Sequence, residues 1–141
     1  MALKADKRDY QNAFHKHFAA YNKWSGTEND LTKRLILVYC VECGLKYKIL
    51  DQTGVFSSSD AQEDVQKLLS SHNIKDLLKF IRWTEPLCDP KIKTHFHENV
   101  SVSDYHQYCR YAIKTEANVK TNEAQFVHSL DMIAQFLRDE V

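Results

Sequence analysis

The sequence has little glycine and proline, no net charge and no long apolar run. It contains 3 glycines and 2 prolines in 141 residues, and this scarcity argues against a turn-rich β protein and favours long helices. The 19 basic and 19 acidic residues balance, so no global positive field attracts nucleic acid and any such contact must be local. No run of 18 apolar residues is present, so we expect no membrane-spanning helix.

The first residues also lack the apolar segment of a signal peptide, because "MALKADKRDY" is strongly polar. We therefore expect a cytoplasmic protein whose four cysteines are thiols. The apolar fraction of 43% and the charged fraction of 27% are typical of a globular protein. A chain of this length fits one domain, which we expect to cover residues 1–141.

Apolar residues at helical spacing predict five or six helices. They cover about 4–24 and 28–51, short segments that begin near Ser59, Asn73 and Ser103, and about 122–139. The second segment carries two adjacent apolar stripes, so it is expected to be the central helix. The stretch 84–102 contains both prolines and has no periodicity, which predicts one long loop. The fold class is therefore all-α, an up-and-down helical bundle.

Local signals place some of the helix ends. Gly26 is a stop signal after the first helix, and Ser59 with Gln62 has the pattern of a capping box. Asn73 and Ser103 are N-cap residues for the fourth and fifth helices. In the first helix, aromatic residues at helical spacing are expected to lie in the core or at a dimer interface.

Four segments follow one another in a recognisable order. The central helix carries Glu42 and Lys46 in "YCVECGLKYKIL", and "SHNIKDLL" with His72 follows. Next comes "CRYA" with Arg110 and Tyr111, and the amphipathic "NEAQFVHSLDMIAQFLRDE" closes the series. This order resembles the HEPN domain family (higher eukaryotes and prokaryotes nucleotide-binding) over most of the chain.

The resemblance implies a helical bundle that forms a homodimer or pairs with another protein, such as a nucleotidyltransferase, in toxin–antitoxin or antiviral defence systems. Many family members are metal-independent ribonucleases that use an Arg followed, after four to six residues, by a His. No His follows Arg110 at that distance, and the one formal match is Arg8 with His15. Two functions stay open: a module that binds RNA, a nucleotide or a protein partner without catalysis, or a metal-independent endoribonuclease. The missing His favours the first slightly.

His72 and Arg110 are the first candidate catalytic pair. Histidine titrates near neutral pH and suits proton transfer, while arginine stabilises phosphate charge through paired hydrogen bonds. In the structural alternative, His72 and Asn73 cap a helix and Arg110 pairs with an acid such as Glu42.

Arg8 and His15 are the second candidate pair. They share a helix face, which two protomers would have to combine into one site. The alternative is an ordinary solvated helix face.

Six further residues are candidates for ligand binding: Glu42, Lys46, Tyr111, Lys93, His95 and His97. The last three stand with Lys91 in the predicted loop, where they form a local basic patch.

We expect neither a cofactor nor a metal ion. Ligand types that suit zinc occur around the predicted loop (Cys88, His95, His97, His106 and Cys109), but their spacing matches no zinc-finger pattern. Cys40 and Cys43 lie on the apolar face of the central helix, which predicts buried thiols rather than a redox pair.

Overall fold

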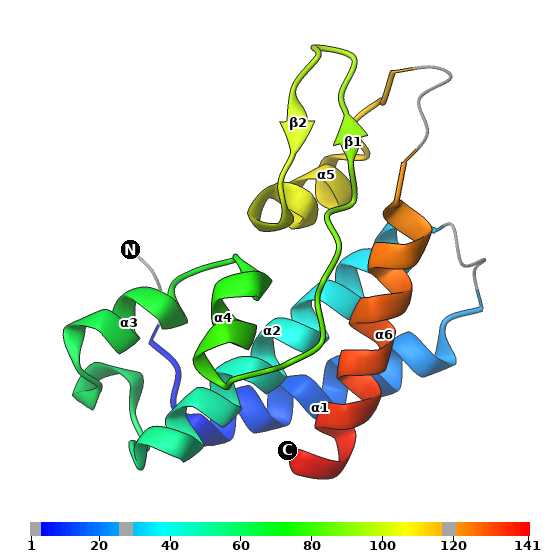
Figure 1. Ribbon diagram of the computed structural model, residues 1–141. Coiled ribbons are helices and arrows are strands. Elements are labelled where there is room, and N and C mark those ends of the chain that lie inside the picture. Colours follow the sequence, from blue (N-terminus) through cyan, green and yellow to red (C-terminus); the bar gives the residue numbers. More distant parts are fainter. Residues whose placement is uncertain (1–3, 26–29, 117–120) are drawn as a thin grey trace.

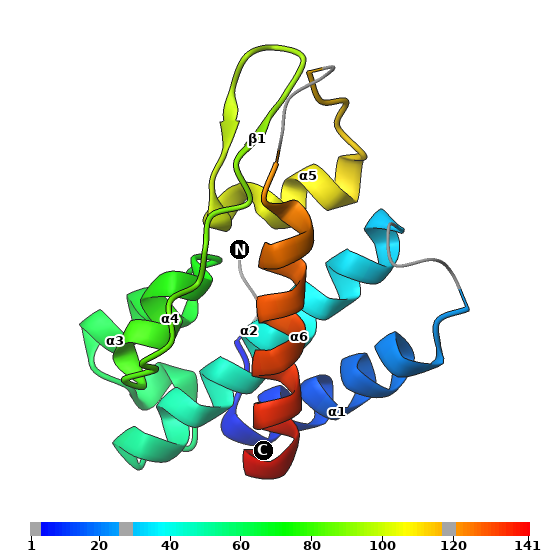
Figure 2. The same cartoon turned by 45° about the vertical axis from the view of Figure 1, so that its right-hand side comes forward.

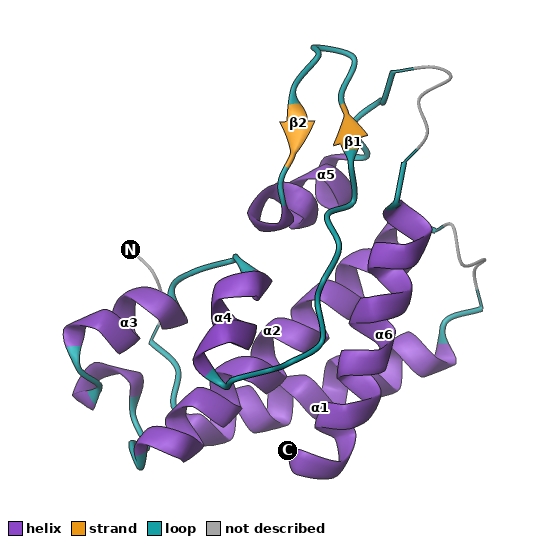
Figure 3. Cartoon of the chain, viewed as in Figure 1, coloured by secondary structure: helices purple, strands orange, loops and turns teal. Residues whose placement is uncertain are grey.

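The computed structural model describes residues 4–25, 30–116 and 121–141. These contain six α-helices, two 3₁₀ turns and one two-stranded sheet, which confirms the all-α prediction (Figures 1 and 3). The helices are α1 (Lys7–Lys23), α2 (Leu31–Thr53), α3 (Glu63–Leu69), α4 (Ile74–Phe80), α5 (Tyr105–Tyr111) and α6 (Glu123–Glu140). The 3₁₀ turns are η1 (Ser58–Asp60) and η2 (Val102–Asp104), and the strands are β1 (Ile92–Lys93) and β2 (Asn99–Val100). Gly26 and residue 28, the predicted end of one helix and start of the next, lie outside the described residues.

Helix α2 is central, as its two apolar stripes predict. It packs against α1, α4, α5 and α6, and α1 runs antiparallel beside it while α6 crosses it (Figures 1 and 2). Most of its buried residues are apolar, among them Leu37, Val41, Leu45 and Ile49. Every other large helix therefore contributes to one core built around α2.

Gly44 marks the closest packing in this core. A Cβ at this position would lie 2.8 Å from Leu137 Cδ1 and 2.9 Å from Phe14 Cδ2, which is inside van der Waals contact. The missing side chain lets α1 and α6 both approach α2 at the same point.

Side-chain bonds fix the helix ends. Asp6 and Asp9 form a reciprocal capping box at α1, and Asp30 Oδ1 accepts from the amides of Thr32 and Lys33 at α2. Gly54 ends α2 in the left-handed conformation, with φ of 69°. The predicted Asn73 cap of α4 is confirmed, because its Oδ1 accepts from the Lys75 amide at 3.1 Å.

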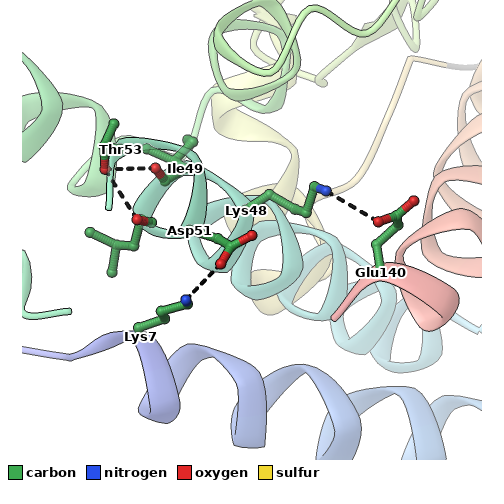
Figure 4. Close-up of polar contacts among 7 residues, drawn as sticks. Lys7, Lys48, Ile49, Asp51, Thr53 and Glu140 are labelled. Atoms are coloured by element: carbon green, nitrogen blue, oxygen red, sulfur yellow. Dashed lines mark hydrogen bonds and ion pairs between the residues drawn. The ribbon is translucent and has the colours of Figure 1, made fainter. Parts of the chain in front are cut away.

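Ion pairs on the surface join the long helices. Lys7 reaches Asp51 at 2.6 Å between α1 and α2, and Lys48 reaches Glu140 at 3.3 Å between α2 and α6 (Figure 4). Near them, the Thr53 hydroxyl donates to the Ile49 carbonyl at 2.8 Å and closes the last turn of α2 (Figure 4). Exposed pairs of this kind contribute about 0–1 kcal/mol each, so packing dominates the stability.

A more buried polar group ties α2, α5 and α6 together. Arg34 Nη1 lies 2.6 Å from Glu123 Oε2, and the Tyr105 hydroxyl donates to the same oxygen at 2.8 Å. Arg34 and Tyr105 are both buried. This group sets the register of α5 against the bundle.

Two predicted helix starts are wrong by a few residues. At the third helix, Ser59 belongs to η1, and α3 begins only at Glu63, with Gln62 as an N-cap that makes no side-chain bond. The extended backbone of Ala61 separates η1 from α3. At the fifth, Ser101 rather than Ser103 provides the cap, and it serves η2, which leads into α5.

The predicted loop 84–102 is wrong in part, because it contains a β-hairpin. Strands β1 and β2 pair antiparallel, with Ile92 opposite Val100 and Lys93 opposite Asn99. The segment after α5 lies along the other edge of β1: the Glu116 amide donates to the Lys93 carbonyl, and the His95 amide donates to the Lys114 carbonyl, both at 3.0 Å. The hairpin extends away from the helices beside α5 (Figures 1 and 2).

No helix within residues 4–25, 30–116 or 121–141 combines the length and the apolar character needed to cross a bilayer.

Candidate functional site

A buried carboxylate and a half-exposed histidine form the centre of the candidate site. Glu42 on α2 is only 4% exposed, and its Oε2 lies 3.2 Å from His72 Nδ1. The His72 side chain is 48% exposed. One edge of the imidazole therefore faces the carboxylate while much of the ring remains open to solvent.

The backbone around His72 is held by its neighbours. The Ser71 hydroxyl accepts from the Asn73 amide at 3.0 Å, and the Asn73 side chain in turn caps α4. These two bonds flank His72 in sequence, so the start of α4 positions the imidazole over α2. In the structural alternative, His72 shares the cap with Asn73; the structure assigns the cap bond to Asn73 and turns His72 toward Glu42.

Glu42 is surrounded by basic groups. Lys46, one turn later on α2, places its Nζ 4.0 Å from the same Oε2, and it is buried as well. Burial raises the pKa of the Glu42 carboxyl, and the charges of Lys46 and His72 oppose that shift. A buried acid between two bases can share a proton with His72, which suits proton transfer.

His106 on α5 completes the cluster. Its ring centroid lies 4.2 Å from that of His72, with the ring planes tilted by 30°, and the residue is 5% exposed. Burial lowers the pKa of His106, and the nearby charges of His72 and Arg110 lower it further. The fold thus favours a neutral His106 beneath an exposed His72.

Two polar atoms in this cluster are left without a hydrogen bond. Within the described part of the chain, Glu42 Oε1 and His106 Nδ1 are buried and have no partner. Buried polar atoms without partners cost stability and are uncommon in folded proteins. Their occurrence in one cluster marks it as a site that the fold does not optimise for stability alone.

Arg110 lies one turn after His106 on α5 and is exposed. Its guanidinium donates a short hydrogen bond to the Tyr39 hydroxyl and lies 6.0 Å from the ring centroid of Tyr111. The alternative in which Arg110 pairs with Glu42 is therefore wrong. Tyr39, which the sequence does not single out, comes from α2, one turn before Glu42.

His106 lies close to both candidate residues. It packs on His72, its spacing of four residues places it on the same face of α5 as Arg110, and the charges of both residues lower its pKa. In the sequence, His106 is considered only as a zinc ligand. The four-residue spacing of His106 and Arg110 is the one signal that could have added it to this site.

The second candidate pair lies elsewhere. Arg8 and His15 are exposed on α1, on the opposite side of α2 from α5 (Figures 1 and 2). His15 Nε2 lies 3.1 Å from the Val141 carbonyl oxygen after α6. The structure does not bring this pair to the Glu42 cluster.

The remaining candidate residues lie in two places, at the end of α5 and on the hairpin. Tyr111 stands beside Arg110 and is 66% exposed. Lys93, His95 and His97 are exposed on the hairpin, where His95 Nδ1 lies 3.1 Å from the Lys114 carbonyl oxygen and His97 contacts the Glu116 carboxylate.

The two cysteines of α2 lack the lowered pKa of a reactive thiol. Cys40 is buried and donates to the Phe14 carbonyl at 3.8 Å, and Cys43 is half-buried beside it on α2. Burial raises the pKa of Cys43 to about 11 and that of Cys40 further, so both are protonated thiols at neutral pH. Across the described ranges, no group of three or more His, Cys, Asp or Glu side chains is arranged to hold a metal ion.

Comparison with known proteins gives no relative from which the role of this site could be inferred. No family model matches the sequence, and no curated protein or solved structure gives a significant match to the chain.

Proposed function

We propose that this protein is an RNA- or nucleotide-binding module that holds a phosphate between His72 and Arg110. One observation carries the proposal: Glu42 contacts His72 Nδ1 at 3.2 Å and leaves the imidazole half-exposed, next to the helix that presents Arg110. The same two residues stand in the motifs that resemble HEPN domains.

The chemistry of these side chains suits a phosphate. An arginine guanidinium binds two phosphate oxygens at once, and the Tyr39 hydroxyl orients the Arg110 guanidinium. The solvent-facing part of the His72 ring can contact another phosphate oxygen, while Nδ1 is held by the Glu42 carboxylate at 3.2 Å. Lys46 balances the charge of Glu42, so the cluster offers an anion a local positive charge in a neutral chain.

A metal-independent endoribonuclease is the second candidate, and the Glu42–His72 contact favours it. A carboxylate that fixes the tautomer of an imidazole prepares it to act as a general base. His72 would take the proton of a ribose 2′-hydroxyl, and the 2′-oxygen would form a bond to phosphorus. The bond to the 5′-oxygen would break, that oxygen would take up the proton that His72 had accepted, and Arg110 would stabilise the charge on the phosphoryl oxygens.

One set of variants tests both candidates. A single-stranded RNA of about eight nucleotides, within the range that single-strand sites cover, is incubated with the protein in EDTA, and binding and cleavage are measured together. We expect Arg110→Ala and His72→Ala to weaken binding, while Arg8→Ala leaves it unchanged. Circular dichroism melting confirms that the variants fold.

The outcomes separate the candidates. RNA that is bound but intact supports the binding module, and RNA cleaved by the wild type but not by His72→Ala supports the endoribonuclease. Loss of activity in Arg8→Ala instead would move the site to α1. Neither binding nor cleavage by the wild type would refute both candidates.

The resemblance to HEPN domains extends the proposal to assembly. We propose a homodimer, or a pairing with a protein such as a nucleotidyltransferase, in a toxin–antitoxin or antiviral defence system. Two exposed apolar side chains on α6, Met132 and Phe136, support a protein contact. Sedimentation equilibrium should give the mass of a dimer, and a monomer at every concentration would leave only the pairing with another protein.

A further inference from the structure

The tip of the hairpin presents an aromatic side chain to solvent. Phe96 is 70% exposed, and the His95 ring packs beside it, with 4.1 Å between ring centroids and a tilt of 40°. Together they form an aromatic surface at the end of an element that projects from the helices (Figure 1). Aromatic and imidazole rings are the surfaces on which unpaired bases stack.

The turn that carries Phe96 is fixed by hydrogen bonds. The Thr94 hydroxyl accepts from the amides of Phe96 at 3.2 Å and Glu98 at 3.3 Å, and the His97 amide donates to the Thr94 carbonyl at 2.9 Å. His97 holds the left-handed conformation, with φ of 63°, although it is not glycine. The turn is therefore pre-organised, and a ligand would bind it with little ordering cost.

Positive charge surrounds this aromatic surface. In the described residues, Lys91, Lys93 and Lys114 have no acidic partner, whereas Asp89 pairs with Lys75 at 2.6 Å and the Glu116 carboxylate contacts the His97 ring. Glu98 is the acid on the hairpin that no cation pairs with. This end of the molecule therefore carries a surplus of positive charge, which suits a polyanion.

Two of these lysines line a hollow on the hairpin. It has a volume of about 610 Å³, and its polar lining comprises Lys91, Lys93, Asn99 and Ser101 together with the carboxylates of Asp89 and Glu116. The amide and the two ammonium groups can contact phosphate and ribose oxygens without reading a base. The aromatic tip and the lysines of this hollow thus offer the two kinds of contact that a nucleic acid strand needs.

The hairpin is continuous with the proposed phosphate site. Lys114 follows Tyr111 by three residues and its carbonyl accepts from the amide of His95, which comes two residues after β1, and β2 leads into the turn that begins α5. A strand held at Arg110 can follow this segment toward Phe96. This continuity favours RNA over a membrane surface, because one RNA strand can contact both the hairpin and the site at His72 and Arg110.

We infer that the hairpin is a second contact for a single-stranded RNA, with a base stacked on Phe96 and His95 and phosphates bound by Lys93 and Lys114. The inference rests on the proposed phosphate site and deepens it, because it makes the ligand an oligonucleotide of several residues rather than a mononucleotide. A dinucleotide fills only the site at His72 and Arg110, and an octanucleotide reaches both.

Binding of fluorescein-labelled dinucleotide and octanucleotide RNA to the full chain, followed by fluorescence anisotropy, tests this inference. We expect Phe96→Leu to weaken octanucleotide binding roughly five- to a hundredfold, the range for loss of one stacked base, and to leave the dinucleotide unchanged. The control is Phe56→Leu, a second exposed phenylalanine, 58% exposed and remote in sequence, which should change neither. Lys93→Gln should reduce the slope of log affinity against log salt for the octanucleotide by about one.

Other outcomes overturn the inference and locate the failure. If Arg110→Ala weakens both ligands and Phe96→Leu weakens neither, the phosphate site stands and the hairpin contact falls. If Phe96→Leu weakens both ligands equally, the hairpin is not a separate contact. If the wild type binds neither RNA but binds phosphatidylserine vesicles through Phe96, the hairpin is a membrane contact and the inference is wrong.

Discussion

At Gly44 a single missing side chain decides how closely three helices pack. A methyl group there would meet Leu137 of α6 and Phe14 of α1 at less than 3 Å. Such positions are hard to recognise in a sequence, because a glycine inside a helix looks only like a weak helix former. The predicted stripes of α2 place its apolar face correctly, but they do not show that two helices meet over one residue.

We predict that Gly44→Ala destabilises the protein by about 1–3 kcal/mol, the usual cost of overpacking a core, although alanine gains about 1 kcal/mol in helix propensity. Urea denaturation measures the loss. The control is the double variant with Leu137→Ala, in which the shortened leucine makes room for the new methyl. The two changes should cost less together than the sum of their separate costs, and strict additivity would contradict the steric explanation.

Asn73 caps α4 and also helps to position His72, the residue before it. We predict that Asn73→Ala destabilises the protein by about 1 kcal/mol, because α4 loses its cap. The same variant should weaken phosphate binding, since one of the two hydrogen bonds that flank His72 is lost. Asn73→Ser keeps a capping oxygen and should retain most of both properties; equal losses in the two variants, measured by thermal melting and anisotropy, would contradict this role of the cap.

At the scale of elements, the long helices were predictable and the short ones only in part. Helix α6 is found within one residue at each end, because Phe126, Leu130, Ile133 and Leu137 repeat on one face and are all buried. The hairpin was missed because each strand has two residues, too few for an alternation to appear. The edge of β1 that does not face β2 also pairs with a segment after α5. No local sequence pattern indicates such a contact.

Helix α5 ends at a residue that is poorly suited to its conformation. Ala112 has a φ of 47°, where glycine is favoured because it has no Cβ. The residue is also exposed, so its methyl group gains no packing that would offset this conformation.

We predict that Ala112→Gly stabilises the protein by about 0.5–1 kcal/mol, by relief of this strain. The control is Ala19→Gly, at an exposed position inside α1, which should destabilise by a similar amount. Chemical denaturation of both variants measures the difference. Destabilisation by both changes would show that the α5 terminus carries no strain.

At the scale of the whole molecule, the candidate site is a meeting of segments that no stretch of sequence displays. Glu42, His72 and Arg110 were predicted from motifs, and the structure brings the first two into contact. His106 and Tyr39 were missed, because their importance arises only when α5 packs on α2 and the start of α4. The resemblance to HEPN domains names the segments without showing which side chains touch.

The buried His106 should make global stability depend on pH. Because its pKa is lowered in the folded state, the unfolded chain binds a proton first as pH falls. The free energy of unfolding should therefore decrease below about pH 6.5, the ordinary value for histidine, and the contribution of His106 is fully present above it.

We predict that His106→Phe, which keeps a ring against His72, gives a shallower loss of stability between about pH 7 and pH 5 than the wild type. Urea denaturation across this range measures both slopes. His128→Gln, at an exposed position on α6, should keep the wild-type slope. Identical slopes for His106→Phe and wild type would mean that His106 titrates alike in the folded and unfolded chains.

The hydrogen bonds on both edges of β1 have a consequence for the chain that they enclose. The segment before α5 and the segment after it bond to the same strand, so the seven residues of α5 sit inside a closed loop whose ends are tied together. A helix of that length is not stable alone in water, and the closed loop reduces the entropy that it must lose to form. Release of the strand on either side would remove this constraint and leave α5 held by its packing on α2 and by the Arg34–Glu123–Tyr105 group alone. The hairpin therefore helps to fix the positions of His106 and Arg110, although it lies outside the helical core.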